Sequence, residues 1–245
     1  MEKIWLERTE LLIKEDGLKK LQNASVLIVG LGGVGSFAAE FVARAGVGKM
    51  TLADGDTVDI TNINRQIPAL HSTIGRPKVE VVAARLLDIN PDLQLTNINR
   101  FLNPKDMENL LDNGNFDYIM DCIDSISPKL TLIKAARRRK IKIVSVMGAG
   151  GKKDPSKVMV RDISKTRDCY LAKQIRKRLK KENIHKGFRC VFSTELQDAN
   201  SLKLTDGSNF KKSFYGTISY MPAIFGLYAA SEVINWLLKN KNPEL

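Results

Sequence analysis

SVLIVGLGGVGSFAAEFVARAG, residues 25–46, contains in one run the features that decide the fold. Its first part, 25–30, is a continuous apolar run of the kind that forms a buried parallel strand. Its second half has small and apolar residues at helical spacing. The turn between them carries the pattern G-x-G-x-x-G, with Gly30, Gly32, Gly33 and Gly35. Because glycines permit a tight turn and a helix N-terminus presents backbone N–H groups, this run predicts a phosphate-binding site.

The same alternation continues on both sides of this run. Further strands are expected at 49–54, 93–102, 117–124 and 141–148, and further helices at 8–23, 78–90, 104–114 and 129–140. Strands that alternate with helices indicate a parallel sheet covered on both faces. The sequence therefore predicts an α/β fold with a Rossmann-like, doubly wound, mostly parallel sheet.

The 245 residues are expected to form a single domain. After about residue 150 the pattern loosens: 173–183 is strongly basic and reads as a helix or a loop, and 184–213 is polar and irregular. We predict four parts in chain order. They are an N-terminal helical arm (1–24), a nucleotide-binding core (25–150), a basic, partly flexible insertion (151–217) and a closing C-terminal helix (218–245).

Polar residues after the second strand suggest which nucleotide binds. Asp54 ends that strand, where a carboxylate can accept hydrogen bonds from ribose hydroxyls. The glycine turn and Asp54 fit a dinucleotide or ATP equally well. The chain then supplies Asn62, Arg65, Gln66 and Lys78. A hydride-transfer enzyme needs no second cationic cluster, whereas an enzyme that attacks the α-phosphate of ATP must hold a triphosphate and neutralise the leaving pyrophosphate. The set therefore favours ATP, although each residue alone would be a solvated loop side chain.

Two carboxylates near the end of the strand at 117–124 are candidate magnesium ligands. Asp121 and Asp124 lie where open α/β sheets bind their ligands. Mg²⁺ prefers one or two carboxylates together with phosphate oxygens. One of the two aspartates is therefore expected to hold Mg²⁺ beside the nucleotide.

The pentapeptide TNINR occurs twice, at 61–65 and at 96–100. The flanking residues of the two copies do not align, so we do not expect a structural repeat. The first copy lies between Asp54 and Lys78, and its Arg65 is expected at the phosphates. The second copy reads as part of a strand, without phosphate-binding residues around it. Replacement of Arg100 is therefore expected to be mild.

The formal net charge of +12 suggests a polyanionic partner, above all nucleic acid. The charge gathers in two clusters: Lys134, Arg137, Arg138, Arg139, Lys140 and Lys142, and then Lys173, Arg176, Lys177, Arg178, Lys180 and Lys181. Either cluster could be merely a solvated face. We favour the second as a contact for a nucleic-acid backbone.

The cysteines indicate a reducing compartment. Together with the character of the N-terminus, they lead us to expect a cytoplasmic protein. Cys122, Cys169 and Cys190 are widely spaced and odd in number, which argues against a disulfide scaffold. Cys122 is expected in the core, and Cys190 is the one candidate for a reactive thiol. The first ten residues are charged, so no signal peptide is expected. The apolar run 218–238 contains polar residues and a proline, so a buried helix is favoured over a membrane-touching one.

In order and spacing, the stretches GLGGVGS, DGDTVDITNINRQ, GRPKVEVVAARLLDINP and DCID resemble the ThiF/MoeB/HesA family, bacterial relatives of ubiquitin-activating enzymes. The resemblance implies ATP-dependent adenylation of a carboxylate. Asp54 would hold the ribose, and Asp56 would lie with it at the nucleotide. Asn62, Arg65, Gln66 and Lys78 would line the phosphates, and Asp124 would bind Mg²⁺. Arg8 would enter the site of a neighbouring subunit, which implies a homodimer.

Within the family, RTELL, DCIDSISPKLTLIKAARRRKI, GAGGKKDP and CVFSTE resemble a branch that modifies tRNA. By this resemblance the substrate is N6-threonylcarbamoyladenosine in tRNA, whose carboxylate is adenylated before dehydration to a cyclic form. A sulfur-transfer protein of the cysteine desulfurase system is a further candidate partner. The alternative is an activator of a ubiquitin-like sulfur carrier, against which the absence of C-x-x-C zinc pairs and the basic charge argue. A nucleotide sensor without chemistry and an NAD-dependent oxidoreductase explain fewer of the residues.

Overall fold

A computed structural model describes residues 4–204 and 213–240. The helices are α1 (Glu7–Gln22), α2 (Gly35–Arg44), α3 (Lys78–Ile89), α4 (Pro104–Asn113), α5 (Ile126–Arg138), α6 (Tyr170–Lys180) and α7 (Tyr220–Asn240). The strands are β1 (Ser25–Val29), β2 (Lys49–Ala53), β3 (Gln94–Ile98), β4 (Tyr118–Asp121), β5 (Lys142–Val146), β6 (Val158–Asp162), β7 (Arg189–Ser193), β8 (Leu202–Leu204) and β9 (Ser213–Tyr215).

Seven strands form the central sheet in the order β3-β2-β1-β4-β5-β7-β6. All neighbouring pairs are parallel except β6 and β7, which are antiparallel. The order reverses direction at β1, so the chain leaves the sheet centre first toward β3 and then toward β6. This is the predicted doubly wound, mostly parallel α/β fold, and it places a topological switch point beside β1 and β4.

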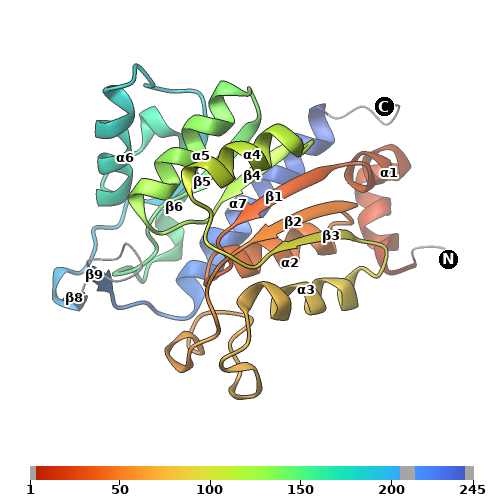
Figure 1. The fold of residues 1–245 in the computed structure, drawn as a ribbon, viewed down its shortest axis with the longest axis horizontal. Coiled ribbons are helices and arrows are strands. Elements are labelled where there is room, and N and C mark those ends of the chain that lie inside the picture. Colours follow the sequence, from red (N-terminus) through yellow and green to blue (C-terminus); the bar gives the residue numbers. More distant parts are fainter. Residues whose placement is uncertain (1–3, 205–212, 241–245) are drawn as a thin grey trace.

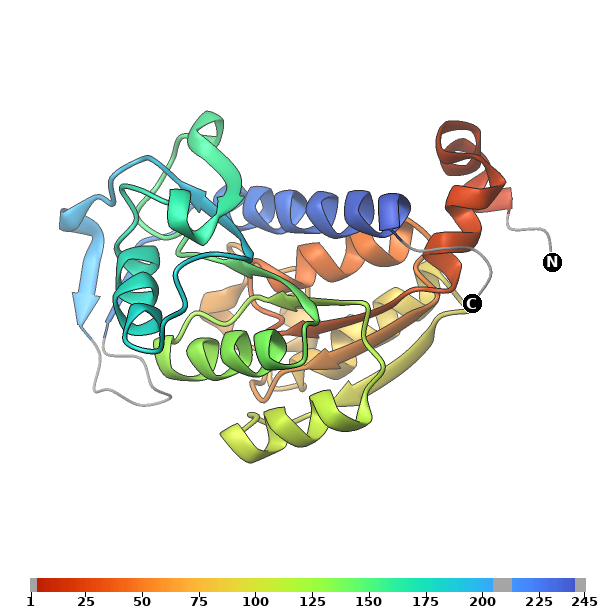
Figure 2. The ribbon, with the colours of Figure 1, turned by 90° about the horizontal axis from the view of Figure 1, so that it is seen from above.

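Helices cover both faces of the sheet (Figures 1 and 2). One apolar core lies between the sheet and the helices α2, α3 and α7, and a second lies between the sheet and α4, α5 and α6. β1 is buried on both sides, with Val26, Leu27 and Ile28 fully inaccessible, which explains its unbroken apolar sequence. The two cores hold the carboxyl ends of the strands in fixed positions relative to one another.

The region after residue 150 differs from the predicted insertion. Its residues supply β6 and β7, which complete the main sheet, and α6, which packs on one face. The sequence does not indicate these elements because α6, the helix between the two strands, is strongly basic and resembles a solvated segment. The antiparallel β6 also breaks the βα rhythm. The segment 205–212 of the predicted insertion and 241–245 of the predicted helix lie outside the described residues.

The apolar run near the C-terminus forms α7, as predicted. α7 has the length and hydropathy of a helix that could cross a membrane, by composition alone. However, its residues Phe225, Ala229 and Val233 are fully buried in the core that α2 shares. Gly226 lies against α2, where a Cβ would come within 2.5 Å of the Val34 carbonyl oxygen. The helix is thus an integral layer of the fold.

α1 is kinked at Lys14, whose φ is 64°. The part after the kink packs on the body through Leu18 and Leu21. The part before it projects from the molecule with Leu11 67% and Leu12 82% exposed (Figures 1 and 2). The predicted helical arm is therefore present, and its first half buries little against its own chain.

Candidate active site

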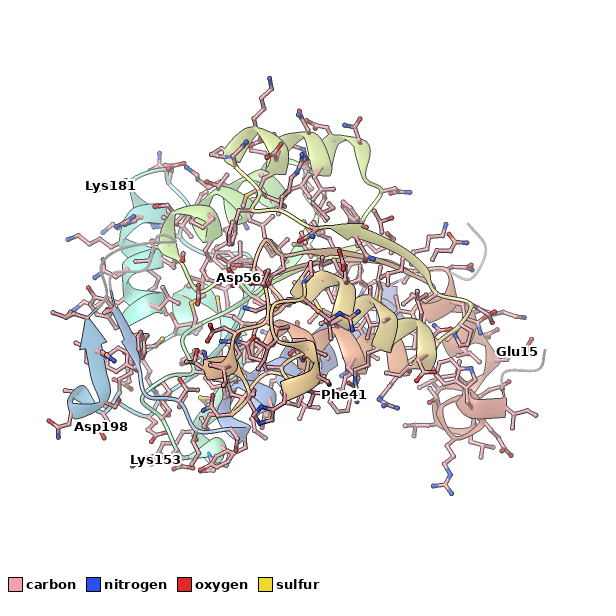
Figure 3. The ribbon with its side chains drawn as sticks, turned by 60° about the horizontal axis from the view of Figure 1, so that its bottom comes forward. Glu15, Phe41, Asp56, Lys153, Lys181 and Asp198 are labelled. Carbon is pink, nitrogen blue, oxygen red and sulfur yellow. The ribbon has the colours of Figure 1, made fainter. Side chains whose placement is uncertain are left out.

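A cavity of about 320 Å³ opens where β1, β2 and β4 end. The predicted residues on its wall are Gly30, Gly32, Gly33, Asp54, Asp56, Arg65, Gln66, Lys78 and Asp124. They come from five separate segments, and the sheet brings them together because its parallel strands end at one edge. Figure 3 shows Asp56, one of these residues, near the middle of the molecule.

The glycine turn between β1 and α2 has two kinds of glycine. Gly30 has a φ of +91°, and a Cβ there would lie 2.9 Å from the Cys122 carbonyl oxygen. A Cβ on Gly35 would lie 1.8 Å from the Gly30 carbonyl oxygen, so Gly35 allows the turn to close although it does not line the cavity. At Gly32 a Cβ would meet nothing closer than Gln66 Nε2, at 3.7 Å. The space in front of Gly32 is therefore open to a ligand.

Asp54 connects this turn to the loop after β2. Its Oδ2 accepts from the Leu31 amide at 2.5 Å, and its Oδ1 accepts from the Asp56 amide at 2.8 Å. Burial raises the pKa of Asp54, and the two amides oppose that rise. The carboxylate is thus fixed in direction and retains lone pairs for the hydroxyls of a ribose.

Lys78, the first residue of α3, is the best buried cation of the cavity wall. Its side chain is 6% exposed, and its Nζ donates to Asp56 Oδ2 at 2.9 Å. Asp56, 43% exposed, orients the ammonium from the open side. A buried ammonium needs a partner, and a phosphate could share or replace the aspartate in that role.

The first TNINR copy begins within a short 3₁₀ turn, Ile60–Asn62, and continues into the segment after it. Asn62 is buried, and its Oδ1 accepts from the Asp59 amide at 3.3 Å. Its carbonyl accepts from the amides of Arg65 and Gln66. Asn62 is not on the cavity wall. The structure therefore gives it the role of shaping the turn that presents the next two side chains.

Gln66 and Arg65 do line the cavity. Gln66 is 9% exposed, and its buried Oε1 has no hydrogen-bond partner among the residues described. An unpaired buried amide at a cavity wall points to a ligand group that the free chain lacks. Arg65 Nη1 donates to the Thr61 carbonyl and to Asn64 Oδ1, both at 2.8 Å. These two bonds hold the guanidinium in place and leave other donors of the fork for a phosphate.

Arg65 and Asp124 form the charged end of the site. Burial lowers the pKa of Arg65, and the negative charge of Asp124 opposes that shift, so the two side chains act on each other. Asp124 also accepts from Ser125 Oγ at 3.2 Å. A cation and an anion side by side suit a site where a phosphate and its metal ion would lie together.

Asp121 has a different role from Asp124. It is fully buried, and its Oδ2 accepts from Lys129 Nζ at 2.8 Å and from Ser145 Oγ at 2.5 Å. Its Oδ1 accepts from the Ile123 amide at 3.2 Å. The aspartate is therefore part of an internal ion pair that fixes the turn carrying Asp124. Of the two candidate magnesium ligands, only Asp124 reaches the cavity.

The cavity also contains residues that the sequence did not suggest. Arg100, Phe101 and Leu102, just after β3, line it together with Met107. The prediction that the second TNINR copy lies away from the phosphate-binding residues is therefore wrong. The reason is the β2–β3 register, which pairs Ala53 with Ile98 and so brings the residues after both strands side by side. A Cβ on Gly55 would meet the Phe101 amide nitrogen at 2.4 Å. The apolar part of this wall could hold a purine base.

Two further predicted residues lie away from the cavity. Arg8 is exposed on the projecting half of α1 and does not line the cavity of its own chain. Cys190 is fully buried in β7, where burial raises the pKa of its thiol. Cys122 does line the cavity, but burial raises its pKa to about 12. Both cysteines are therefore poor sources of a thiolate nucleophile.

Known proteins resemble this chain over almost its whole length. A tRNA threonylcarbamoyladenosine dehydratase of Bacillus subtilis is 41% identical over 240 residues, covering 95% of this chain and 94% of that protein. The crystal structure of E. coli tRNA N6-threonylcarbamoyladenosine dehydratase in complex with ATP superposes with a TM-score of 0.87 at 37% identity, covering 97% of this chain and 96% of that one.

A second kind of adenylating enzyme matches over a shorter stretch. The molybdopterin-synthase adenylyltransferase of Escherichia coli is 38% identical over 130 residues, which is 53% of this chain and 51% of that protein. The full-length similarity is therefore to the tRNA-modifying enzymes. The ThiF family model matches residues 6–245, and the chain belongs to the ThiF family.

Proposed function

We propose that this protein is an ATP-dependent enzyme that adenylates the carboxylate of N6-threonylcarbamoyladenosine in tRNA and promotes its dehydration to the cyclic form. The observation that carries the proposal is the cavity itself. It joins a glycine turn, the carboxylate of Asp54, Arg65, Lys78 and Asp124 in one site, on a chain that resembles such dehydratases from end to end.

The chemistry begins with ATP in the cavity. The base would lie against Phe101 and Leu102, the ribose at Asp54, and the phosphates between the glycine turn and the cations. The threonyl carboxylate then attacks the α-phosphorus, and pyrophosphate leaves. Arg65 and Lys78 would stabilise the negative charge that builds up on the transferring phosphoryl group and the leaving group.

The second step needs no enzyme nucleophile. A nitrogen of the substrate's own carbamoyl group attacks the activated carbonyl carbon, loses its proton, and displaces AMP as a five-membered ring closes. Because nucleophile and electrophile belong to one molecule, proximity supplies most of the entropic advantage. The raised pKa values of Cys122 and Cys190 agree with a reaction that uses no thiolate.

Mg²⁺ fits the donor set. No group of three or more histidine, cysteine, aspartate or glutamate side chains that could hold a metal occurs among the described residues. Mg²⁺ commonly takes one or two carboxylates and completes its shell with phosphate oxygens and water. Asp124 would hold the ion, which would neutralise phosphate charge when bound.

The proposal includes a homodimer in which Arg8 serves the neighbouring site. Leu11 and Leu12, exposed on the projecting half of α1, support it because such apolar side chains need a covering surface. Arg8 lies on the same half-helix. A sulfur-transfer protein stays a predicted partner. The cytoplasm is the proposed location, in keeping with three free cysteines.

The activator of a ubiquitin-like sulfur carrier was the alternative from sequence. Similarity to a sulfur-carrier activator that covers about half of the chain supports it less than similarity to the dehydratases over the full length. The test is mass spectrometry of nucleosides from tRNA incubated with enzyme and ATP. We expect N6-threonylcarbamoyladenosine to lose one water. An unchanged nucleoside, with ATP consumed only when a carrier protein is added, would reverse the choice.

A further inference from the structure

Helix α6 has one buried face and one basic face. Ala172, Ile175 and Leu179 are buried in the core under the sheet. On the outer face Lys173, Lys177 and Lys180 are exposed and recur three and four residues apart, so they share one side of the helix. We call these three lysines the α6 row. At the helical rise it extends over about 10 Å.

The charge of the α6 row is not compensated within the part of the chain that the structure describes. The helix YLAKQIRKRLK contains no acidic residue. Among the described residues, none of the three lysines forms an ion pair, whereas their neighbour Arg176 donates a hydrogen bond to Thr166 Oγ1. Like charges one turn apart repel one another, and a polyanion along the row would remove that repulsion.

The other basic cluster of the sequence has a different environment. Lys134 pairs with Glu182 at 2.9 Å, and Arg139 pairs with Glu108 and Asp112 at 2.6 and 2.7 Å. Arg138 also pairs with Glu108. These cations hold α5 against α4 and the loop after α6. Lys134, Arg138 and Arg139 therefore have a structural use, whereas the three lysines of the α6 row have no such acidic partner among the described residues.

The N-terminal end of α6 lies near the segment that follows the cavity wall. Gly150 lines the cavity, and two residues later the buried Lys152 feels the charges of Asp168 and Glu195. Asp168 directly precedes Cys169, the residue that caps α6. Both views place α6 at the opposite end of the molecule from α1 (Figures 1 and 2). Tyr170, the first residue of α6, is 63% exposed at this near end.

We propose that the α6 row binds the sugar-phosphate backbone of the tRNA substrate and that Tyr170 stacks on one of its unpaired bases. This inference rests on the proposed function and specifies how its macromolecular substrate docks. Lysine ammonium groups neutralise phosphates without reading sequence, and exposed aromatic rings stack on bases in single-stranded loops. The row guides the tRNA to the cavity, and the cavity recognises the modified nucleoside.

The test measures the affinity of unmodified tRNA, which cannot react, at several salt concentrations. The triple variant Lys173→Ala, Lys177→Ala, Lys180→Ala should bind roughly tenfold or more weakly, and its slope of log affinity against log salt should fall by about 0.7 to 0.9 for each lost phosphate contact. A matched control removes three exposed lysines elsewhere: Lys49→Ala, Lys105→Ala, Lys239→Ala. Native affinity in the α6 variant, or an equal loss in the control, would overturn the proposal.

The variant Tyr170→Ala tests the contribution of base stacking to tRNA affinity apart from that of charge. Its affinity should fall roughly fivefold or more while the salt slope stays native, because stacking releases no counterions. A changed slope, or no loss of affinity, would remove Tyr170 from the interface.

A second readout distinguishes this inference from the proposed function. The isolated N6-threonylcarbamoyladenosine nucleoside is too small to reach α6, so the triple α6 variant should convert it at the native rate. Equal loss of nucleoside turnover would show damage to the fold and contradict the docking role. If the native enzyme converts neither tRNA nor nucleoside, the proposed function fails, while the salt slopes still report whether α6 binds RNA.

Discussion

Asp124 and Arg65 are the two charged side chains on which the proposed chemistry depends most. Asp124→Asn keeps the size of the side chain but removes its charge, so the metal ion and its hold on the phosphates should be lost. We expect AMP formation to fall to background while the melting temperature stays near the native value. Asp88→Asn, on the exposed side of α3, is the matched control. Normal turnover of Asp124→Asn would refute its metal role.

Replacement of the two arginines of the repeated TNINR should affect the reaction to different degrees. Arg65→Ala should lower the rate roughly 10³-fold or more, as for other arginines that stabilise a transferring phosphoryl group. Arg100 also lines the cavity, but its side chain is 65% exposed and only loosely paired with Asp106, at 3.5 Å. We expect Arg100→Ala to raise the KM for ATP several-fold with little change in kcat, as for uniform binding. A normal KM would show that Arg100 takes no part in binding ATP.

Two glycines of the turn should differ when alanine replaces them. Gly35→Ala places a Cβ on the Gly30 carbonyl oxygen, so the turn must open, at a cost of about 1–3 kcal/mol typical of overpacking. Gly32→Ala meets no close atom and should keep its stability but block the approach of a phosphate. Thermal melting with and without ATP checks both. Equal melting temperatures for the two apo variants would contradict these roles.

At the scale of elements, the core between residues 25 and 150 could be predicted because its strands, except the edge strand β3, are buried on both faces and its helices have clear apolar spacing. β6 and β7 could not, since β6 runs antiparallel to its neighbour and the helix between the two strands is strongly basic, so the strands are recognised only through their pairing. For the same reason Arg100 was missed: its position depends on the register of β2 and β3. The roles of Asp121 and Asp124, three residues apart, could be distinguished only from the structure, in which Asp121 is fully buried and paired with Lys129.

The projecting half of α1 carries Arg8, which we propose to reach the site of the neighbouring subunit. If Arg8 completes the neighbouring site, Arg8→Ala and Asp124→Asn should each be inactive alone. Mixing them after dissociation should restore activity, because one site of each mixed dimer then has both native residues. At equal amounts we expect about a quarter of native turnover from the statistics of a two-fold dimer. An inactive mixture, with mixed dimers confirmed by mass spectrometry, would place Arg8 outside the partner's site.

At the scale of the whole molecule, the fold puts two surfaces to separate uses. The carboxyl edge of the parallel strands holds the cavity, and the outer face of α6 presents positive charge that has no acidic partner among the described residues. α1 projects from the opposite end (Figure 2). A large polyanionic substrate could therefore lie along α6 while an arm exchanged between subunits completes the cavity.

The most direct test of the central proposal is the rate of AMP release with ATP and three additions: tRNA that carries threonylcarbamoyladenosine, the same tRNA without that modification, and no tRNA. We predict AMP only with the modified tRNA, since its carboxylate is the group that becomes adenylated. AMP release at the same rate with unmodified tRNA, or none with modified tRNA, would contradict the proposal.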